Sequence, residues 1–354
     1  MKKYICMALA VVMVFSCAAC GGGNPTASTT TTTATTTTTL TPTPVSSFEY
    51  EAVNDGIVIA KYIGTDKNVV VPDAIEGKPV TELQYMTFWQ NKDIESVVLP
   101  QTLVKIGPGA FEECTSLTTV VLPEGLQEIG FEAFLKCEKL TGIKLPASLN
   151  QIGGMAFSEC VSIKEITIPE NCMVGGEAFA KCSSLKHIKI PQSCNLMDCV
   201  FVYSGLETVE LEEGIESIPY DCFVGTNLRS ITLPKTVKEI RGEAFADCKN
   251  LETVILNEGL EKVGDGAFNG TKITEIVIPS TVTDILDTSF SYCSKLDKIK
   301  FEGDAPKEFL WIHKGVDGQD IRIEAQDVHF TIYYHEGAAG FTSPEWFGYP
   351  TAIW

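Results

Sequence analysis

The stretch "AFEECTSLTTVVLP", from Ala110 to Pro123, decides the fold. Its second half has apolar residues at Leu117, Val120 and Leu122, and this near-alternation predicts a short strand with one buried face. Proline then ends the strand, because it has no backbone N–H to donate to a neighbouring strand. The stretch therefore predicts a turn that carries a large aromatic residue, followed by a strand and a second turn.

Close copies of this stretch recur at intervals of 21 to 23 residues through most of the chain. The last strand residues form one column: Leu99, Leu122, Leu145, Ile168, Ile190, Leu211, Leu233, Leu256, Ile278 and Phe301. The aromatic residues form another: Phe88, Phe111, Phe134, Phe157, Phe179, Phe201, Phe223, Phe245, Phe268 and Phe290. One such unit cannot bury its own apolar face, so the units must stack. The repeats predict a β-rich solenoid of about ten coils with a parallel sheet on one face.

The repeat also resembles a known family. The pattern "AFxxCxxLxxVxLPxxLxxIG" appears as "AFEECTSLTTVVLPEGLQEIG" and again as "AFLKCEKLTGIKLPASLNQIG". It resembles the BspA-like leucine-rich repeats, also called the Treponema pallidum type, over residues from about 50 to 354. This resemblance implies a curved solenoid on a bacterial surface protein, with adhesion or binding to host and matrix proteins as its role.

The two ends of the repeat region depart from the period. Residues 48–93 contain the hairpin signal Asn54-Asp55-Gly56, and we interpret them as an N-terminal cap with an irregular first coil. The regular repeats occupy residues 94–302. Residues 303–354 lose the period and are rich in aromatic residues, which indicates a C-terminal cap over the last coil. A separate small C-terminal domain is the alternative.

The N-terminus has the pattern of an export signal. Two lysines, a short apolar run and "SCAACGGG" predict a signal peptide over residues 1–19. The pattern resembles a bacterial lipobox, and this resemblance implies lipidation of Cys20; an ordinary secretory signal is the alternative. Residues 20–47 are rich in threonine and proline and uncharged, which predicts a disordered tether. We therefore expect an exported protein, anchored in the cell membrane through Cys20 and displayed at the cell surface.

Six of the thirteen cysteines lie three residues after a repeat phenylalanine: Cys114, Cys137, Cys160, Cys182, Cys248 and Cys293. Other coils carry asparagine, serine or threonine there, which are small side chains that hydrogen-bond to backbone in turns. This exchange predicts buried, free turn cysteines. Disulfides between stacked coils are an alternative, because neighbouring Cα atoms fall within bridging range. Zinc binding is disfavoured, since the one C-x2-C spacing, Cys17 to Cys20, lies in the signal.

The net charge and the spacing of the histidines argue against several classes of function. The chain has 27 basic and 46 acidic residues, a net charge of -19, which argues against binding nucleic acid. The four histidines show no spacing typical of metal ligands or a catalytic triad. We therefore expect no enzyme activity, no metal and no cofactor.

The outward positions of the predicted sheet are the candidate binding surface. They alternate with the buried positions, and the middle coils place charged side chains there: Lys144, Glu165, His187, Lys189 and Glu210. We expect a surface protein that binds an unidentified protein or glycan through these residues. A carbohydrate-binding protein and a structural envelope protein are the alternatives. The outward rows contain no aromatic residue, which argues against the first of these.

Overall fold

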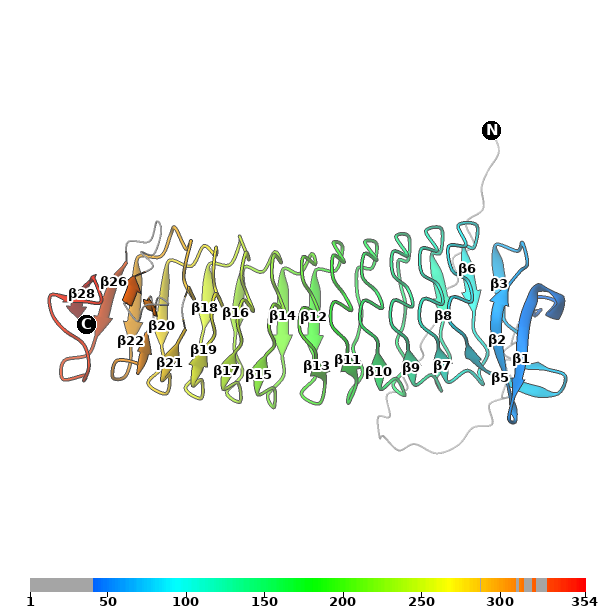
Figure 1. Ribbon diagram of the computed structural model, residues 1–354, viewed down its shortest axis with the longest axis horizontal. Coiled ribbons are helices and arrows are strands. Elements are labelled where there is room, and N and C mark those ends of the chain that lie inside the picture. Colours follow the sequence, from blue (N-terminus) through cyan, green and yellow to red (C-terminus); the bar gives the residue numbers. More distant parts are fainter. Residues whose placement is uncertain (1–40, 287, 310–311, 315–319, 323–329) are drawn as a thin grey trace, which may run out of the picture. The chain divides into compact units, whose positions relative to one another are not determined.

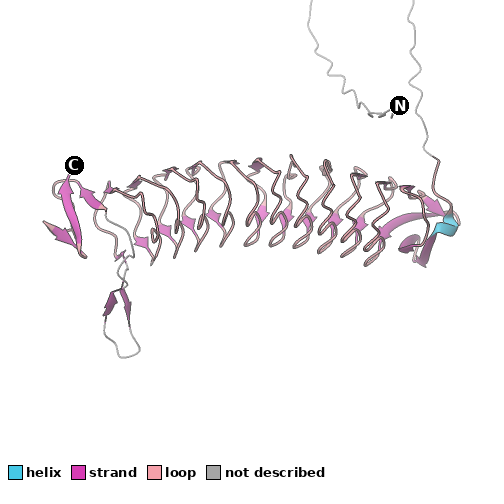
Figure 2. Ribbon diagram, turned by 90° about the horizontal axis from the view of Figure 1, so that it is seen from above, coloured by secondary structure: helices cyan, strands magenta, loops and turns pink. Residues whose placement is uncertain are grey.

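The structure is a stack of coils. The computed structural model describes residues 41–286, 288–309, 312–314, 320–322 and 330–354. They form a β-solenoid of about 12 turns with almost no helix (Figure 1 and Figure 2). The predicted solenoid is confirmed, and it has more turns than the ten coils expected because both ends continue the stack. Within the described ranges, no helix is long and apolar enough to cross a membrane.

Two parallel ladders of strands run along the stack, and the first ladder contains the predicted strands. Its strands are β3 (Asn68–Val70), β6 (Ser96–Val98), β8 (Thr119–Val121), β12 (His187–Ile190), β14 (Thr208–Leu211), β16 (Ser230–Thr232), β18 (Thr253–Ile255), β20 (Glu275–Ile278), β22 (Lys298–Phe301), β26 (Thr331–Tyr334) and β28 (Tyr349–Ile353). In β8, Val120 is buried and its neighbours Thr119 and Val121 are exposed. Equivalent residues of paired strands lie directly opposite each other, as Thr119 does to Ser96.

A second parallel ladder follows the turn after most first-ladder strands, and the sequence did not predict it. Its strands are β2 (Gly56–Tyr62), β5 (Lys78–Leu83), β7 (Lys105–Ile106), β9 (Glu128–Ile129), β10 (Gln151–Ile152), β11 (Met173–Val174), β13 (Asn195–Leu196), β15 (Ser217–Ile218), β17 (Glu239–Ile240), β19 (Lys262–Val263), β21 (Asp284–Ile285) and β23 (Glu308–Phe309). The prediction of one sheet was therefore incomplete. Most of these strands have two residues, too few to show an alternating pattern.

Neither ladder is continuous. The first consists of separate pieces, which are β3-β6-β8, β12-β14, β16-β18 and β20-β22-β26-β28. Only a single bridge, Thr119 to Gly142, continues it past β8, and residues 163–169 form no strand. The second ladder breaks once, between β13 and β15. These interruptions matter because the hollows of the surface lie beside them.

The core is a column of phenylalanine rings. From Phe88 to Phe290, successive rings stack with centroids 4.8 to 5.8 Å apart and planes within 2 to 11° of parallel. Every one of these side chains is at most 2% exposed. Such stacking of large rings adds specific contacts to the hydrophobic burial of each coil. The predicted aromatic column is therefore confirmed as the centre of the core.

The turns that carry these rings hold backbone of left-handed conformation. The residues two before and two after each phenylalanine have positive φ, as Glu132 (55°) and Lys136 (58°) do around Phe134. Most of their N–H groups bond to the next coil, as from Glu132 to the Gly154 carbonyl and from Lys136 to the Ser158 carbonyl, each at 2.9 Å. The left-handed residues thus supply hydrogen bonds between coils.

The N-terminal end is capped by a hairpin, as predicted. Strand β1 (Phe48–Val53) pairs antiparallel with β2 through the two-residue turn Asn54-Asp55, and β4 (Ala74–Ile75) pairs antiparallel with β5. The predicted tether ends earlier than residue 47. Buried Thr43 donates its N–H to the Val70 carbonyl and accepts the Val70 N–H at its hydroxyl, and a 3-10 helix η1 (Val45–Ser47) follows. The sequence did not predict this contact, because Thr43 belongs to a threonine-rich segment whose composition predicts disorder. The predicted signal over residues 1–19, the lipidation site Cys20 and the tether as far as residue 40 lie outside the described residues.

The C-terminal end continues the first ladder. Strand β26 pairs with β22 and β28 pairs with β26, both parallel, and β27 (Glu345–Trp346) folds back antiparallel onto β28. Phe341 and Trp346 close the end of the core against Phe301. Strands β24 (Ile312–Lys314) and β25 (Asp320–Arg322) form a separate antiparallel pair. Residues 330–354 thus share a sheet with the repeats instead of forming a sheet of their own.

Candidate functional site

The predicted outward rows of the first ladder do face solvent. Their members alternate with buried residues in most coils, so that Lys189 and His187 of β12 are exposed while Ile188 is fully buried. Beyond the predicted rows, Tyr333 of β26 lies opposite Lys300 of β22 and adds an aromatic residue to the second row. The side chains that can meet a ligand on this face are therefore mostly charged or hydroxyl groups.

Lys144 and Glu165 line a hollow of about 520 Å³ on this face. Its floor includes Leu122, Ile143 and Ile166, and Glu124 at its edge pairs with Lys144 at 3.7 Å. The hollow lies where the strands of the first ladder are interrupted after β8. Gly142 contributes to it, because no atom lies within 4 Å of the position that a Cβ would occupy. An apolar floor with opposite charges at its edge suits a polar ligand that also buries an apolar group.

His187, Lys189 and Glu210 form a second group, on the paired strands β12 and β14. His187 Nδ1 lies 2.8 Å from the Thr208 hydroxyl. Lys189 Nζ lies 3.4 Å from Glu210 Oε1 and 2.7 Å from Glu212 Oε1. The hydrogen bonds with Glu212 and Glu210 raise the Lys189 pKa, and the bond from Lys189 lowers the Glu212 pKa. All three predicted residues are engaged in exposed contacts between strands.

The structure therefore brings the five predicted residues together as two neighbouring groups. The hollow contains Lys144 and Glu165, and the β12-β14 pair contains the other three. Sequence reasoning missed Glu124 and Glu212, which lie in the turns after the strands and pair with the two lysines. It also missed Gly142 as the cause of a hollow. The signal in the sequence was that Gly142 is the glycine in an outward row whose other members have side chains.

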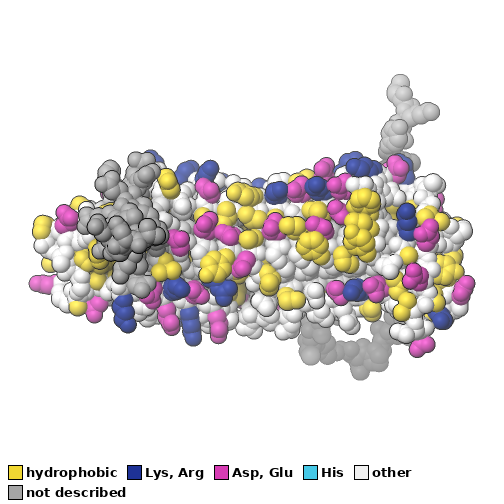
Figure 3. Space-filling model, viewed as in Figure 1, with side chains coloured by type: hydrophobic (Ala, Val, Ile, Leu, Met, Phe, Trp, Pro, Cys, Tyr) yellow, Lys and Arg dark blue, Asp and Glu magenta, His cyan; other side chains and the backbone are white. Residues whose placement is uncertain are grey.

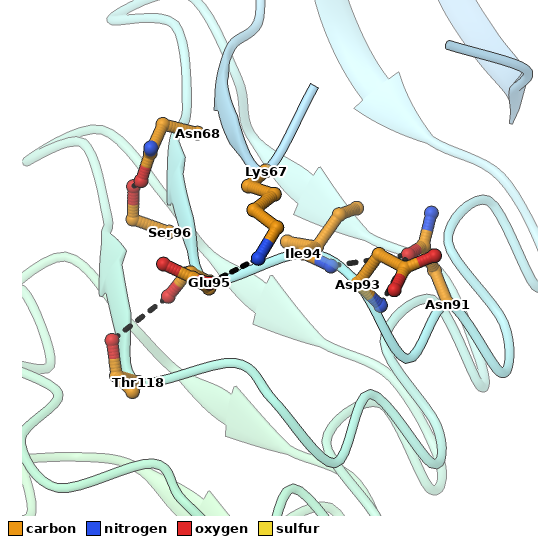
Figure 4. A network of polar contacts seen from close by, with 8 residues as sticks. All are labelled: Lys67, Asn68, Asn91, Asp93, Ile94, Glu95, Ser96 and Thr118. Atoms are coloured by element: carbon orange, nitrogen blue, oxygen red, sulfur yellow. Dashed lines mark hydrogen bonds and ion pairs between the residues drawn. The ribbon is translucent and has the colours of Figure 1, made fainter. Parts of the chain in front are cut away.

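The turn cysteines are free and buried, as predicted. Each donates a thiol hydrogen bond to the carbonyl of the phenylalanine in the preceding coil, at 3.1 to 3.2 Å. In the first coil Asn91 fills the same turn, and its side-chain oxygen accepts the N–H groups of Asp93 and Ile94 (Figure 4). Burial raises the pKa of the Cys114 and Cys182 thiols to about 12. These thiols are structural turn groups.

Groups typical of a catalytic or metal site do not converge in the described part of the chain. No three His, Cys, Asp or Glu side chains of the described residues are placed to hold a metal ion. Of the histidines whose side chains are described, His187 contacts a threonine and His335 pairs with Glu302 at 3.3 Å. On the face seen in Figure 3, acidic and basic side chains are interspersed. The recognisable features are those of a binding surface.

Comparison with known proteins identifies the family. The BspA type leucine rich repeat region matches residues 81–207 and 173–297, in six copies. The chain belongs to this family. The fold of the family is typically a non-enzymatic binding scaffold. No curated protein matches the chain significantly.

Solved structures of bacterial leucine-rich repeat proteins are similar to the BspA-type chain. A protein from Bacteroides ovatus is 26% identical with a TM-score of 0.60, over 81% of this chain and 70% of that one. The pneumococcal vaccine antigen PcpA is 20% identical with a TM-score of 0.52, over 82% and 92%, and this likeness shows the fold alone. The leucine-rich repeat protein of Treponema pallidum is 27% identical with a TM-score of 0.45, over 72% and 91%.

Proposed function

We propose that this BspA-type protein is a lipid-anchored cell-surface protein that binds another protein through the outward face of the first ladder. The observation that carries the proposal is the hollow beside Lys144 and Glu165, next to the charged pair of strands β12 and β14. An apolar floor allows a partner's side chain to be buried, and the charged edge favours one orientation of it. Adhesion to a host or matrix protein is the role that fits a bacterial protein of this family.

Display at the surface is supported by the pattern of the first residues. A short apolar run before "SCAAC" is typical of an exported protein, and lipidation of Cys20 would anchor it. A tether that then reaches Thr43, which bonds to Val70, would hold the solenoid away from the membrane. Labelling cells with a palmitate analogue tests the anchor: the full chain should be labelled and its Cys20→Ala variant should not.

Binding should depend on the two predicted groups of residues. A matrix-protein and glycan array probed with the full-length protein would first identify a partner. A variant with Lys144→Ala, His187→Ala and Lys189→Ala should then bind that partner at least about tenfold more weakly, since charged anchors at an interface each contribute on the order of 1 kcal/mol. A matched variant with Lys249→Ala and Lys262→Ala removes lysines outside the outward rows and should bind normally. Equal binding by both variants would contradict the proposed face.

Carbohydrate binding is a second candidate function, because one end of the face carries aromatic side chains. Tyr333 continues the second outward row, and the Trp354 ring lies 4.8 Å from Lys300 Nζ and stacks on His335. Aromatic faces are common platforms in ligand sites. If only glycans on the array bind, and Tyr333→Ala abolishes their binding while the lysine variant does not, this second function replaces the first.

A further inference from the structure

The second ladder is broken at one junction, between β13 and β15. At other junctions along this ladder two backbone bonds recur between adjacent coils. One example runs from the Lys238 N–H to the Glu216 carbonyl at 2.8 Å, and from the Arg241 N–H to the Ile218 carbonyl at 3.0 Å. At the broken junction the corresponding donors are residues 216 and 219. Neither donates such a bond within the described structure.

Pro219 explains the break. The equivalent position in other coils is an N–H donor to the coil before it: Gly107, Gly130, Gly153, Gly175, Met197, Arg241, Gly264 and Leu286. Proline has no N–H, so the Leu196 carbonyl cannot receive its bond. In intact coils the carbonyls equivalent to those of Cys194 and Leu196 accept N–H groups from the next coil. The Cys194 and Leu196 carbonyls therefore face the junction without a backbone donor. A ligand that covers these carbonyls excludes water from them, which favours a ligand with a group that can donate to them.

Three columns of equivalent inward-facing residues become partly exposed to solvent at the same junction. Residues at these positions are almost all buried in the other coils, whereas Cys194, Leu196, Leu211 and Ile215 are all partly exposed here. Cys194 stands where several coils have leucine, such as Leu126, which is fully buried. The smaller side chain leaves volume unfilled. Each coil is thus a control for its neighbours, and among the junctions that the structure describes only this one combines a missing donor with a missing side-chain volume.

The result is a crevice of about 220 Å³ that reaches the core at Phe223 and has Glu216 and Arg241 among its lining residues. We propose that this crevice is a binding site for an apolar side chain on a peptide segment of a partner protein. The side chain fills the volume that Cys194 leaves, and a backbone N–H of the same segment donates to the Leu196 carbonyl. The volume suits one leucine- or phenylalanine-sized group, because a cavity of about 150 Å³ holds benzene.

The orphaned carbonyls favour a peptide over a purely apolar molecule. An apolar guest would fill the volume and leave the Cys194 and Leu196 carbonyls without donors. A peptide offers an apolar side chain and an N–H group within a few ångströms of each other, as segments that add to sheet edges do. The crevice is lined mostly by the second ladder and its turns, with Ile190 of β12 and Leu211 of β14 also contributing, and it includes none of the five outward residues proposed above.

The test is methyl NMR of the full-length protein with N-acetyl-leucine amide as the probe. The Ile215 and Ile218 methyl signals should shift saturably with a Kd on the order of millimolar, as expected for so small a ligand. The methyls of Ile152 and Ile240, which occupy the same strand position in intact coils, should not shift. Toluene provides volume without an N–H group, and it should bind at least about tenfold more weakly.

Two variants remove the two features of the crevice, one variant for each feature; we call them the closing variants. Pro219→Gly restores the donor to the Leu196 carbonyl, and Cys194→Leu fills the volume; each should weaken binding of the probe at least about tenfold. Cys194→Ala enlarges the volume and Pro100→Gly removes a proline far from the junction, so both should bind as the wild type does. No saturable shift, equal binding of toluene, or unchanged binding by both closing variants would overturn the proposal. Because each closing variant acts alone, the test holds if one fails to fold.

Discussion

Single residues in the phenylalanine turns adopt a backbone conformation that their type disfavours. Glutamate, lysine, methionine and tyrosine occupy most of the left-handed positions, such as Met155 (56°), Glu177 (58°) and Tyr203 (55°). A left-handed residue with a Cβ costs roughly 1–2 kcal/mol. Most of these N–H groups bond to the next coil, as Met155 does to the Gly176 carbonyl at 2.9 Å, and these bonds offset that cost. Sequence reasoning did not predict these positions, because few are glycine or asparagine, the residues that normally mark them.

Glycine at one of these positions should stabilise the protein. Glu177→Gly removes the Cβ that makes this backbone conformation unfavourable, so the free energy of unfolding should rise by up to about 1 kcal/mol after the entropy cost of glycine. Glu177→Ala keeps the Cβ and should bring no such gain. Gln151→Gly, in strand β10, should instead lower stability by about 0.5–1 kcal/mol. Urea unfolding compares the four proteins, and a Glu177→Gly variant no more stable than Glu177→Ala would contradict the argument.

The turn thiols make stability sensitive to alkaline pH. Burial raises the pKa of Cys182 from 9.0 to about 12, so the folded protein keeps a proton that the unfolded chain loses above pH 9. The contribution of this group is therefore complete below pH 9 and is lost between pH 9 and about 12. In that window it lowers the free energy of unfolding by about 1.4 kcal/mol per pH unit.

A single variant isolates this effect. Cys182→Ala loses the bond to the Phe157 carbonyl, which lowers stability by a constant amount at every pH. It also removes one titrating thiol, so its stability should fall less steeply than that of the wild type between pH 9 and 11. Denaturant unfolding at several pH values measures both slopes. Parallel curves for the two proteins would show that burial of this thiol is not linked to folding.

At the scale of whole elements, the long strands were predictable and the short ones were not. The first ladder shows an apolar residue at every second position, such as Val97 and Leu99, and this pattern predicted most of its strands; the strands expected to end at Leu145 and Ile168 do not form. The second ladder has a single buried residue per strand, such as Ile129, which no periodicity can reveal. The same holds for the candidate binding residues. The outward rows could be predicted from the alternating sequence pattern, but the hollow could not, because it results from an interruption of the ladder.

Two glycines near the ladders should respond oppositely to an added side chain. At Gly153 a Cβ would lie 2.5 Å from backbone atoms of Gly130 and Phe131, so Gly153→Ala should lower the free energy of unfolding by about 2–3 kcal/mol. At Gly142 a Cβ meets open space, and the same row holds Thr119 and Thr208. Gly142→Thr should therefore raise stability by about 0.5–1 kcal/mol, because glycine weakens a strand. Thermal unfolding of both variants gives the sign of each effect.

The whole molecule is a one-dimensional stack, and its function could be predicted only in part. The period and the family pattern were sufficient for the fold, because each coil repeats the same contacts with its neighbours. The position of the crevice was not predictable, since it depends on Pro219 and Cys194 together at one junction. The lipid anchor at Cys20 stays a prediction that rests on the N-terminal pattern. The hollow and the crevice of this solenoid lie where the repetition of strands fails, and each failure involves few residues.

A one-dimensional stack should tolerate loss of one whole coil but not of half a coil. Deleting residues 212–233 joins Leu211 to Pro234, which recreates the regular order of strand and proline and places the Arg241 N–H next to the Leu196 carbonyl. The shortened protein should keep its circular dichroism spectrum, and its denaturant m-value should fall by roughly a twelfth, in proportion to the surface lost. Deleting residues 212–222 removes half of the same coil and brings Phe223 directly after Leu211. This variant should not fold, because every later side chain is then out of register with the core. Equal tolerance of both deletions would show that the coils do not depend on register, and the stacked-ring core would then not be what holds them together.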